Sequence, residues 1–271
     1  MRPAIISLAI LTGLAAIAVA GGLSAHPDRA GDPAAATIEA RLAGAKPAAP
    51  AARRDDPGSV RAIWRPNQWL RQALPGRIKR SRFKPRFGGK AIRFEVRPGD
   101  VEPATGSGRA ELSGPTFDEG DDIYVHDGIR VPRAASFRGP WQIVQQLHET
   151  DWGGSPGIAV FLDGDRRLRI AAGDGSPRFW RGPRLKPNRW YSLTYRVMLS
   201  GSSSAGFVEV WLNGVHRTVR GNRYRAVGQT IQTSRTYIKV GIYRSRSSTG
   251  RSVVEHSRVM VGTSLGAVLP D

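Results

Sequence analysis

Turn residues divide most of this chain into runs that are too short for ordinary helices. From about residue 59 onward, short apolar or alternating runs recur between Gly, Pro, Asn and Asp residues. Two of the separators, Asp163-Gly164 and Asn213-Gly214, are dipeptides that two-residue β-hairpin turns prefer, because both turn positions need positive φ. The candidate strands are residues 91–96, 109–112, 123–131, 141–148, 158–162, 168–171, 190–199, 207–212, 237–243 and 253–261. Beyond a short helix expected around residues 66–74, no long segment has a helical period. The pattern predicts an all-β sandwich or β-jelly roll.

The N-terminal segment has the features of a secretory signal peptide. Met1-Arg2-Pro3 carries a positive charge, residues 4–20 carry none, and Ala18-Val19-Ala20 is a small-x-small cleavage pattern, with a second at Leu23-Ser24-Ala25. We therefore assign residues 1–25 to a signal peptide and expect a secreted or periplasmic protein. The alternative is an uncleaved anchor, and only then would a membrane be a partner.

A linker and one folded domain account for the rest of the chain. Residues 26–58 are rich in Ala, Pro, Gly and Asp and contain almost no large apolar residue, which is typical of a flexible linker. Residues 59–271 then form the domain, which we expect to be monomeric. The chain has no cysteine, which excludes disulfides, zinc–thiolate sites and a cysteine nucleophile.

The charge of the chain predicts an anionic partner. The formal net charge is +19, and because basic and acidic residues balance within residues 26–58, the domain carries nearly all of this excess. Such an excess is typical of proteins that bind nucleic acid, anionic membranes or acidic polysaccharides. Since an exported protein rarely meets nucleic acid, we expect an anionic polysaccharide as the partner and no nucleic acid.

Alternation along the candidate strands assigns side chains to faces, because residues two apart share a face. Within residues 141–148, we expect a core face formed by Trp141, Ile143, Gln145 and Leu147. The opposite, polar face is formed by Gln142, Val144, Gln146 and His148. Within residues 237–243, an apolar face lies opposite Tyr237, Lys239, Gly241 and Tyr243. We interpret Gly241 as leaving room for a ligand.

The polar faces carry the groups that β-elimination on a uronic acid needs. Arg109 and Glu111 share a face, and together with Gln146, His148 and Tyr243 they supply a guanidinium, an amide, an imidazole and a phenol. The reaction removes the C5 proton beside a carboxylate, whose charge must first be neutralised by hydrogen-bond donors. A base and an acid must then move protons at C5 and at the leaving oxygen.

Three motifs resemble successive strands of jelly-roll polysaccharide lyases, among them alginate lyases. They are Arg109-Ala110-Glu111-Leu112, Gln146-Leu147-His148 and Tyr237-Ile238-Lys239-Val240-Gly241-Ile242-Tyr243. Residues 93–100 and 241–244 are more similar to the heparin lyase I-like and glucuronan lyase-like branch, and the resemblance covers about residues 88–263. It implies a concanavalin A-like sandwich of two antiparallel sheets and a polysaccharide lyase that acts by β-elimination.

The resemblance also implies roles for individual residues. Arg109 and Gln146 would neutralise the carboxylate, His148 would be the base or a second neutralising group, and Tyr243 would be the acid, or acid and base together. Lys239 would bind substrate or tune Tyr243, and Glu111 would orient Arg109.

Other residues depart from the family pattern or leave alternatives open. Arg244 follows Tyr243 directly, whereas alginate lyases usually have a Gln one residue further on, which weakens an assignment to alginate. We count Arg244 and His126 among the substrate-binding residues, and His126 is also a rival base. We expect His216 and His256 at the surface. The acidic residues Asp118, Glu119, Asp121 and Asp122 fit the calcium that some relatives bind, but we expect neither a metal nor another cofactor. The basic stretch of residues 77–90 is either a polyanion-binding edge or an exposed basic strand.

Competing functions are a non-catalytic module that binds anionic polysaccharide, a glycoside hydrolase and a nucleic-acid-binding protein. The module would keep basic and aromatic residues but lose the His148–Tyr243 pair. A retaining hydrolase needs paired carboxylates on one strand face, and no Glu-x-Asp-x-x-Glu strand occurs in the chain. The signal peptide opposes nucleic-acid binding.

Overall fold

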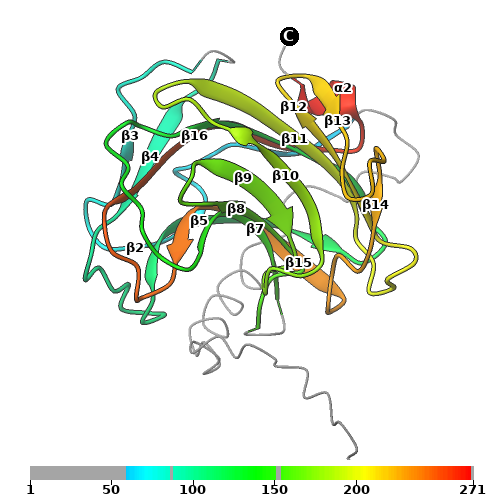
Figure 1. Ribbon diagram of the computed structural model, residues 1–271, viewed down its shortest axis with the longest axis horizontal. Coiled ribbons are helices and arrows are strands. Elements are labelled where there is room, and N and C mark those ends of the chain that lie inside the picture. Colours follow the sequence, from blue (N-terminus) through cyan, green and yellow to red (C-terminus); the bar gives the residue numbers. More distant parts are fainter. Residues whose placement is uncertain (1–58, 86–87, 151–153, 270–271) are drawn as a thin grey trace, which may run out of the picture. The chain divides into compact units, whose positions relative to one another are not determined.

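A computed structural model describes residues 59–85, 88–150 and 154–269. The predicted signal peptide and linker lie outside these residues. The described residues form two antiparallel sheets packed face to face, which confirms the predicted all-β sandwich (Figure 1). Among them, no helix is long and apolar enough to cross a membrane.

Nine strands form the first layer, which we call sheet A. In spatial order its path is β13 (Val215–Arg217), β12 (Phe207–Leu212), β11 (Trp190–Met198), β6 (Asp122–Arg130), β16 (Ser252–Gly262), β4 (Ala91–Val96) and β3 (Ile78–Arg80), with β1 (Val60–Ile63) beside β16 and β14 (Ala226–Val227) beside β12. The predicted basic stretch therefore includes an edge strand, β3. Residues 66–74 hold turns and a strand of the other sheet, so the helix expected there was wrong.

Seven strands form the second layer, sheet B. In spatial order they are β10 (Arg178–Arg184), β9 (Arg167–Ala171), β8 (Ile158–Leu162), β7 (Gln142–Glu149), β15 (Arg235–Arg244), β5 (Gly108–Asp118) and β2 (Leu70–Ala73). A short helix, α2 (Leu265–Val268), follows β16 and is capped by Ser264. The central strands β7, β15 and β5 are far apart in sequence, so only the sheet makes them neighbours.

Local turn chemistry explains the hairpins. Asn213 and Gly214 have φ values of 54° and 76° between β12 and β13, as a two-residue turn requires. The hairpin at Asp163-Gly164 also forms, but its loop runs from Asp163 to Arg166, and the positive φ falls on Arg166. The hairpin prediction was therefore correct at both places, and the two-residue turn only at the first.

The interior between the sheets is mostly apolar and encloses a buried pair formed by His256 and Asp127. Val254, Phe94 and Ile129 belong to a single buried cluster that spans both sheets. His256, predicted at the surface, is instead fully buried there, with Nδ1 2.7 Å from Oδ2 of Asp127. An imidazole and a carboxylate inside the core must satisfy each other, because neither is in contact with water.

Candidate active site

The three strands that carry the predicted motifs are neighbours in sheet B, in the order β7-β15-β5. Lys239 on β15 pairs with Gln146 on β7, while Gly241 and Tyr243 pair with Glu111 and Arg109 on β5. Residues paired across strands share a face. Arg109, Glu111, Gln146, His148, Lys239 and Tyr243 therefore line one side of sheet B, which we call the polar face.

Glu111 is the hub of the polar face. Its Oε1 accepts a hydrogen bond from Nε2 of Gln146 at 2.6 Å, and its Oε2 lies 3.2 Å from Nζ of Lys239 and 3.7 Å from Nη1 of Arg109. Burial alone would raise the pKa of Glu111, but the charges of Lys239 and Arg109 hold it below its usual range. The carboxylate is therefore ionised and orients three donors, more than the single Arg109 contact expected of it.

Arg109 joins this hub to an aromatic pair. Its Nε donates to Oγ of Ser107 at 2.7 Å, and its guanidinium carbon lies 4.3 Å from the ring centroid of Tyr243. The Tyr243 ring in turn packs edge-on against Trp141, with centroids 4.8 Å apart. Tyr243 is thus held between a cation and an indole, which restricts where its hydroxyl points.

His148 is a neutral imidazole. Its Nδ1–H donates to the carbonyl oxygen of Glu149 at 2.8 Å, so the proton sits on Nδ1 and Nε2 carries the lone pair. Burial, reinforced by the nearby charge of Lys239, lowers the pKa of His148 to about 3. The imidazole is therefore unprotonated throughout the neutral range.

His148 and Tyr243 lie at opposite ends of the hub. His148 pairs with Tyr237, whereas Tyr243 pairs with Ile143, five residues away along β7. At about 3.3 Å per residue, those two positions of β7 are about 16 Å apart along the strand. Glu111 and Gln146 lie between them, so the two groups do not form a directly bonded pair.

A bulge at residues 143–145 changes the expected faces of β7. The register against β8 shifts between Ile143 and Gln145. Ile143 and Trp141 consequently lie with Tyr243, while Gln145 points into the core and donates to Asp127 at 3.3 Å. The core-facing assignment of Trp141 and Ile143, and the outward assignment of Val144, were wrong, because one extra residue inverts the alternation.

Gly241 has a backbone role. Its φ is 144°, and an added Cβ would lie 2.2 Å from the carbonyl oxygen of Ala110 and 2.8 Å from Phe94 in the core. The contacts are with the neighbouring strand and the interior, so the interpretation of Gly241 as room for a ligand was wrong. Glycine is needed because β5 approaches the backbone closely here, at the point where the register between β15 and β7 shifts.

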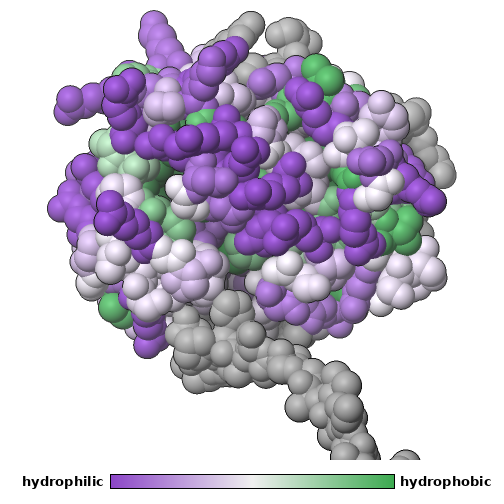
Figure 2. Space-filling view, in the orientation of Figure 1, coloured by the Kyte–Doolittle hydropathy of each residue, from purple (hydrophilic) through white to green (hydrophobic). Residues whose placement is uncertain are grey.

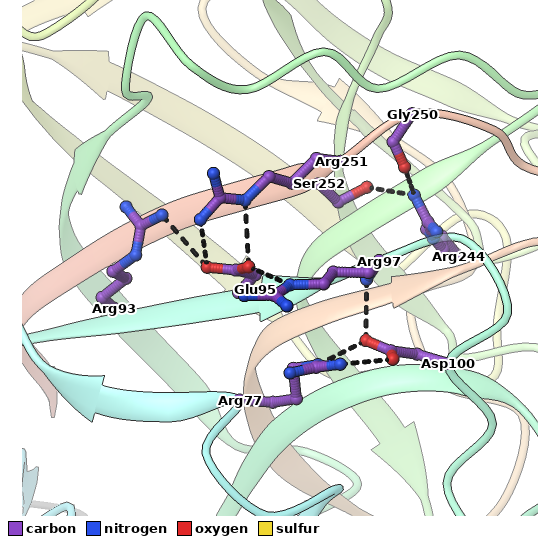
Figure 3. Close-up of polar contacts among 9 residues, drawn as sticks. All are labelled: Arg77, Arg93, Glu95, Arg97, Asp100, Arg244, Gly250, Arg251 and Ser252. Carbon is purple, nitrogen blue, oxygen red and sulfur yellow. Dashed lines mark hydrogen bonds and ion pairs between the residues drawn. The ribbon is translucent and has the colours of Figure 1, made fainter.

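Two predicted binding residues lie away from the polar face. Arg244 is buried, and its Nη1 donates to Gly250 O in the connection before β16 and to Oγ of Ser252 at the start of β16, both at 2.9 Å (Figure 3). His126 is buried in sheet A, with Nδ1 3.0 Å from Oγ1 of Thr194. Neither side chain is placed to contact a substrate at Glu111.

The acidic loop does not gather its carboxylates. Asp118, Asp121 and Asp122 pair with Arg235, Arg61 and Arg196, and Glu119 accepts from the backbone of Gly201. Within the described ranges, no group of three His, Cys, Asp or Glu side chains is placed to hold a metal ion.

Two aromatic residues of the site were given no role from the sequence. Tyr237 packs against His148, with ring centroids 5.4 Å apart, and Trp141 packs against Tyr243. Tyr237 opens the same motif that contains Lys239 and Tyr243, so its position two residues before Lys239 was a usable signal. Nothing in the local pattern indicated Trp141, because the bulge decides its face.

Comparisons with known proteins agree with this fold. A family model described as polysaccharide lyase matches residues 59–257. A crystal structure of endo-β-1,4-glucuronan lyase from Trichoderma reesei is 16% identical, covers 76% of this chain and 95% of its own, and has a TM-score of 0.55, which shows a shared fold. An alginate lyase from Corynebacterium sp. is 17% identical over 67% of this chain and 82% of its own, with a TM-score of 0.43. No curated protein sequence matches the chain.

Proposed function

Because the chain belongs to the polysaccharide lyase family, we propose that the polar face of sheet B is its active site and that it cleaves a uronic-acid-containing polysaccharide by β-elimination. The observation that carries this proposal is the Glu111 hub. It orients Arg109, Gln146 and Lys239 side by side, and these are donors that a uronate carboxylate accepts.

Neutralisation of the carboxylate is the first requirement of the reaction. Arg109 and Gln146 donate to the carboxylate of the uronate whose C4–O bond breaks. These hydrogen bonds stabilise the negative charge that develops at C5 of that sugar. Lys239 adds a positive charge to the same region. Glu111 acts as a positioning residue, since its own oxygens are used by these donors and not by substrate.

Two proton transfers complete the elimination. A base removes the C5 proton, the C5–H electron pair becomes the C4–C5 double bond, and the C4–O bond breaks with its electrons on oxygen, which an acid protonates. His148 has an unprotonated Nε2 and Tyr243 a hydroxyl, and the carboxylate-binding residues lie between them. We assign His148 as the base and Tyr243 as the acid, approaching the sugar from its two sides.

The charge of the domain and the N-terminal sequence support the setting of this reaction. A formal net charge of +19 attracts a polyanionic chain. The pattern of residues 1–25 supports export to the periplasm or medium, and we propose that the enzyme works there as a monomer.

The test is to incubate the full-length protein with a panel of polyuronates and to follow the ultraviolet absorbance of the new double bond. Tyr243→Phe and His148→Ala should each lower kcat by at least about a hundredfold, the usual contribution of a positioned acid or base. Tyr124→Phe, a tyrosine on sheet A, is the matched control and should retain activity. Binding without any absorbance change on the whole panel would instead identify a binding module, and activity that survives in Tyr243→Phe would refute the assignment of the acid.

A further inference from the structure

An apolar strip continues the polar face across sheet B. Ile143, Ala159, Phe161 and Ala171 form a cluster separate from the main core, and Trp141 and Tyr243 pack against it. These residues come from β7, β8 and β9, the three successive strands on one side of β15. These four side chains are buried, and the partly exposed rings of Trp141 and Tyr243 pack against them. A sugar chain that leaves the hub in this direction therefore meets these two aromatic rings, which suit the C–H faces of pyranose rings.

Strand register aligns this strip with two arginines. Tyr243 pairs with Ile143, Ile143 with Phe161, Phe161 with Arg169, and Arg169 with Arg181 on β10. The row runs across the strands, and at about 4.8 Å per strand Arg169 lies about 14 Å from Tyr243. This span is longer than one monosaccharide.

Arg169 lies flat at the end of the strip. Its guanidinium carbon is 3.9 Å from the ring centroid of Phe161, and its Nε meets Oδ1 of Asp163 at 3.4 Å. Arg181 shares the same carboxylate, with Nε 3.5 Å from Oδ2, and its Nη2 also donates to Oδ2 of Asp165 at 3.0 Å. The two contacts with Asp163 are long for charge-assisted hydrogen bonds, so this carboxylate only partly satisfies the two guanidinium groups.

Positive charge exceeds negative charge around this end of the row. The charged residues that interact here are Arg167 and Arg169 on β9, Arg178 and Arg181 on β10, and Asp163 and Asp165 in the loop between β8 and β9. Burial lowers the pKa of Arg169, and repulsion from Arg178 and Arg181 contributes to that shift despite the attraction of Asp163. Hydrophilic side chains cover the middle of the face in Figure 2, where β9 and β10 lie in Figure 1.

A cavity opens beside Arg181. It has a volume of about 320 Å³ and lies between the loop that precedes β7 and the hairpin of β8 and β9. Trp141, Asp163 and Arg181 are among its lining residues. The row thus ends in a hollow with a cation at its wall.

We propose that Arg169 and Arg181 form a distal arginine site that binds a second uronate carboxylate of the same polysaccharide chain, several sugars from the bond that is cleaved. The site deepens the proposed function and rests on it. A guanidinium fork matches a carboxylate in two parallel hydrogen bonds, which a neutral sugar cannot replace. The enzyme therefore prefers long chains, because only these reach from Arg109 to Arg169.

The test measures how affinity grows with chain length. β-1,4-linked glucuronate oligosaccharides from trimer to octamer are titrated into the Tyr243→Phe protein, in which cleavage is blocked, with cello-oligosaccharides of equal length as the uncharged comparison. Affinity should rise at the length that spans the row, and only for the glucuronates. Arg169→Gln should remove that rise, lowering the affinity for long chains by at least about tenfold and leaving short chains unchanged.

Arg225→Gln is the matched control. Arg225 also stacks on a phenylalanine, with its guanidinium carbon 3.8 Å from the Phe207 centroid, and pairs with Glu209 at 2.8 Å, but it directly precedes β14 of the other sheet, sheet A. It should not change the length dependence. If Arg169→Gln does not fold, the more exposed Arg181→Gln takes its place.

The outcomes separate the two proposals. Equal affinity losses in Arg169→Gln and Arg225→Gln, or a loss that is the same at every length, would overturn the distal site while cleavage by the unmutated protein still supported the lyase. Absence of cleavage with an intact length effect would overturn the lyase assignment and keep the distal site as a polyuronate-binding site.

Discussion

Protonation of His126 should weaken the fold in mild acid. The imidazole is fully buried in sheet A, and burial, aided by the charge of Arg258, lowers its pKa from 6.5 to about 4. Between these values the unfolded chain binds a proton that the folded protein does not, so stability falls as the pH falls through this window. At about pH 5, where the unfolded imidazole is almost fully charged, linkage gives a cost of about 2 kcal/mol relative to pH 8.

Comparison with His126→Asn isolates this cost. An Asn side chain can still bond to Thr194, the partner of Nδ1, but it does not titrate. Urea unfolding followed by tryptophan fluorescence at about pH 8 and about pH 5 gives the free energy of unfolding of both proteins. The wild type should lose about 2 kcal/mol more than the variant between the two pH values, and an equal loss in both would refute the reasoning. Catalytic activity at neutral pH should survive the substitution, since His126 lies in the other sheet.

Three further predictions concern the polar face. Because the pKa of His148 is lowered to about 3, the profile of kcat/KM against pH should show no ascending limb near the ordinary pKa of histidine. An ascending limb there that disappears in His148→Ala would contradict this prediction. Gly241→Ala should destabilise the protein by at least about 2 kcal/mol in urea unfolding, because φ is 144° and the new Cβ would meet the Ala110 carbonyl. An unchanged free energy of unfolding would mean that the backbone around residue 241 shifts without cost. Glu111→Gln should cost about 3 kcal/mol by leaving Lys239 buried without its counter-charge, whereas Glu111→Gln with Lys239→Met should recover most of that loss in a double-mutant cycle.

Much of the site was visible in the sequence because its signals are local. The alternation within each motif placed Glu111 with Arg109 and Gln146 with His148, and the structure keeps both pairs together. The same motifs and turns also predicted the lyase family and the all-β class, and both predictions are confirmed. The role of Glu111 as a hub was not, because its partners Gln146 and Lys239 come from strands distant in sequence.

Some errors arose where one residue changes the geometry. The bulge near Val144 inverts the face of Trp141, and it leaves no mark in composition or period. Arg244 follows Tyr243 directly, so alternation alone puts it on the opposite face, yet the motif resemblance suggested a binding role. Its partners Gly250 and Ser252 show a structural one.

The sequence by itself therefore determined most of the longer strands, the hairpin at Asn213-Gly214 and the chemical character of many strand faces, since alternation and turn preferences act over a few residues. The tertiary structure decided which strands are neighbours, that His126 is buried in the other sheet, and that Arg169 ends a row that begins at Tyr243. Those outcomes depend on pairing between residues far apart in the chain. Such pairing is selected by the packing of the whole core, to which every strand contributes.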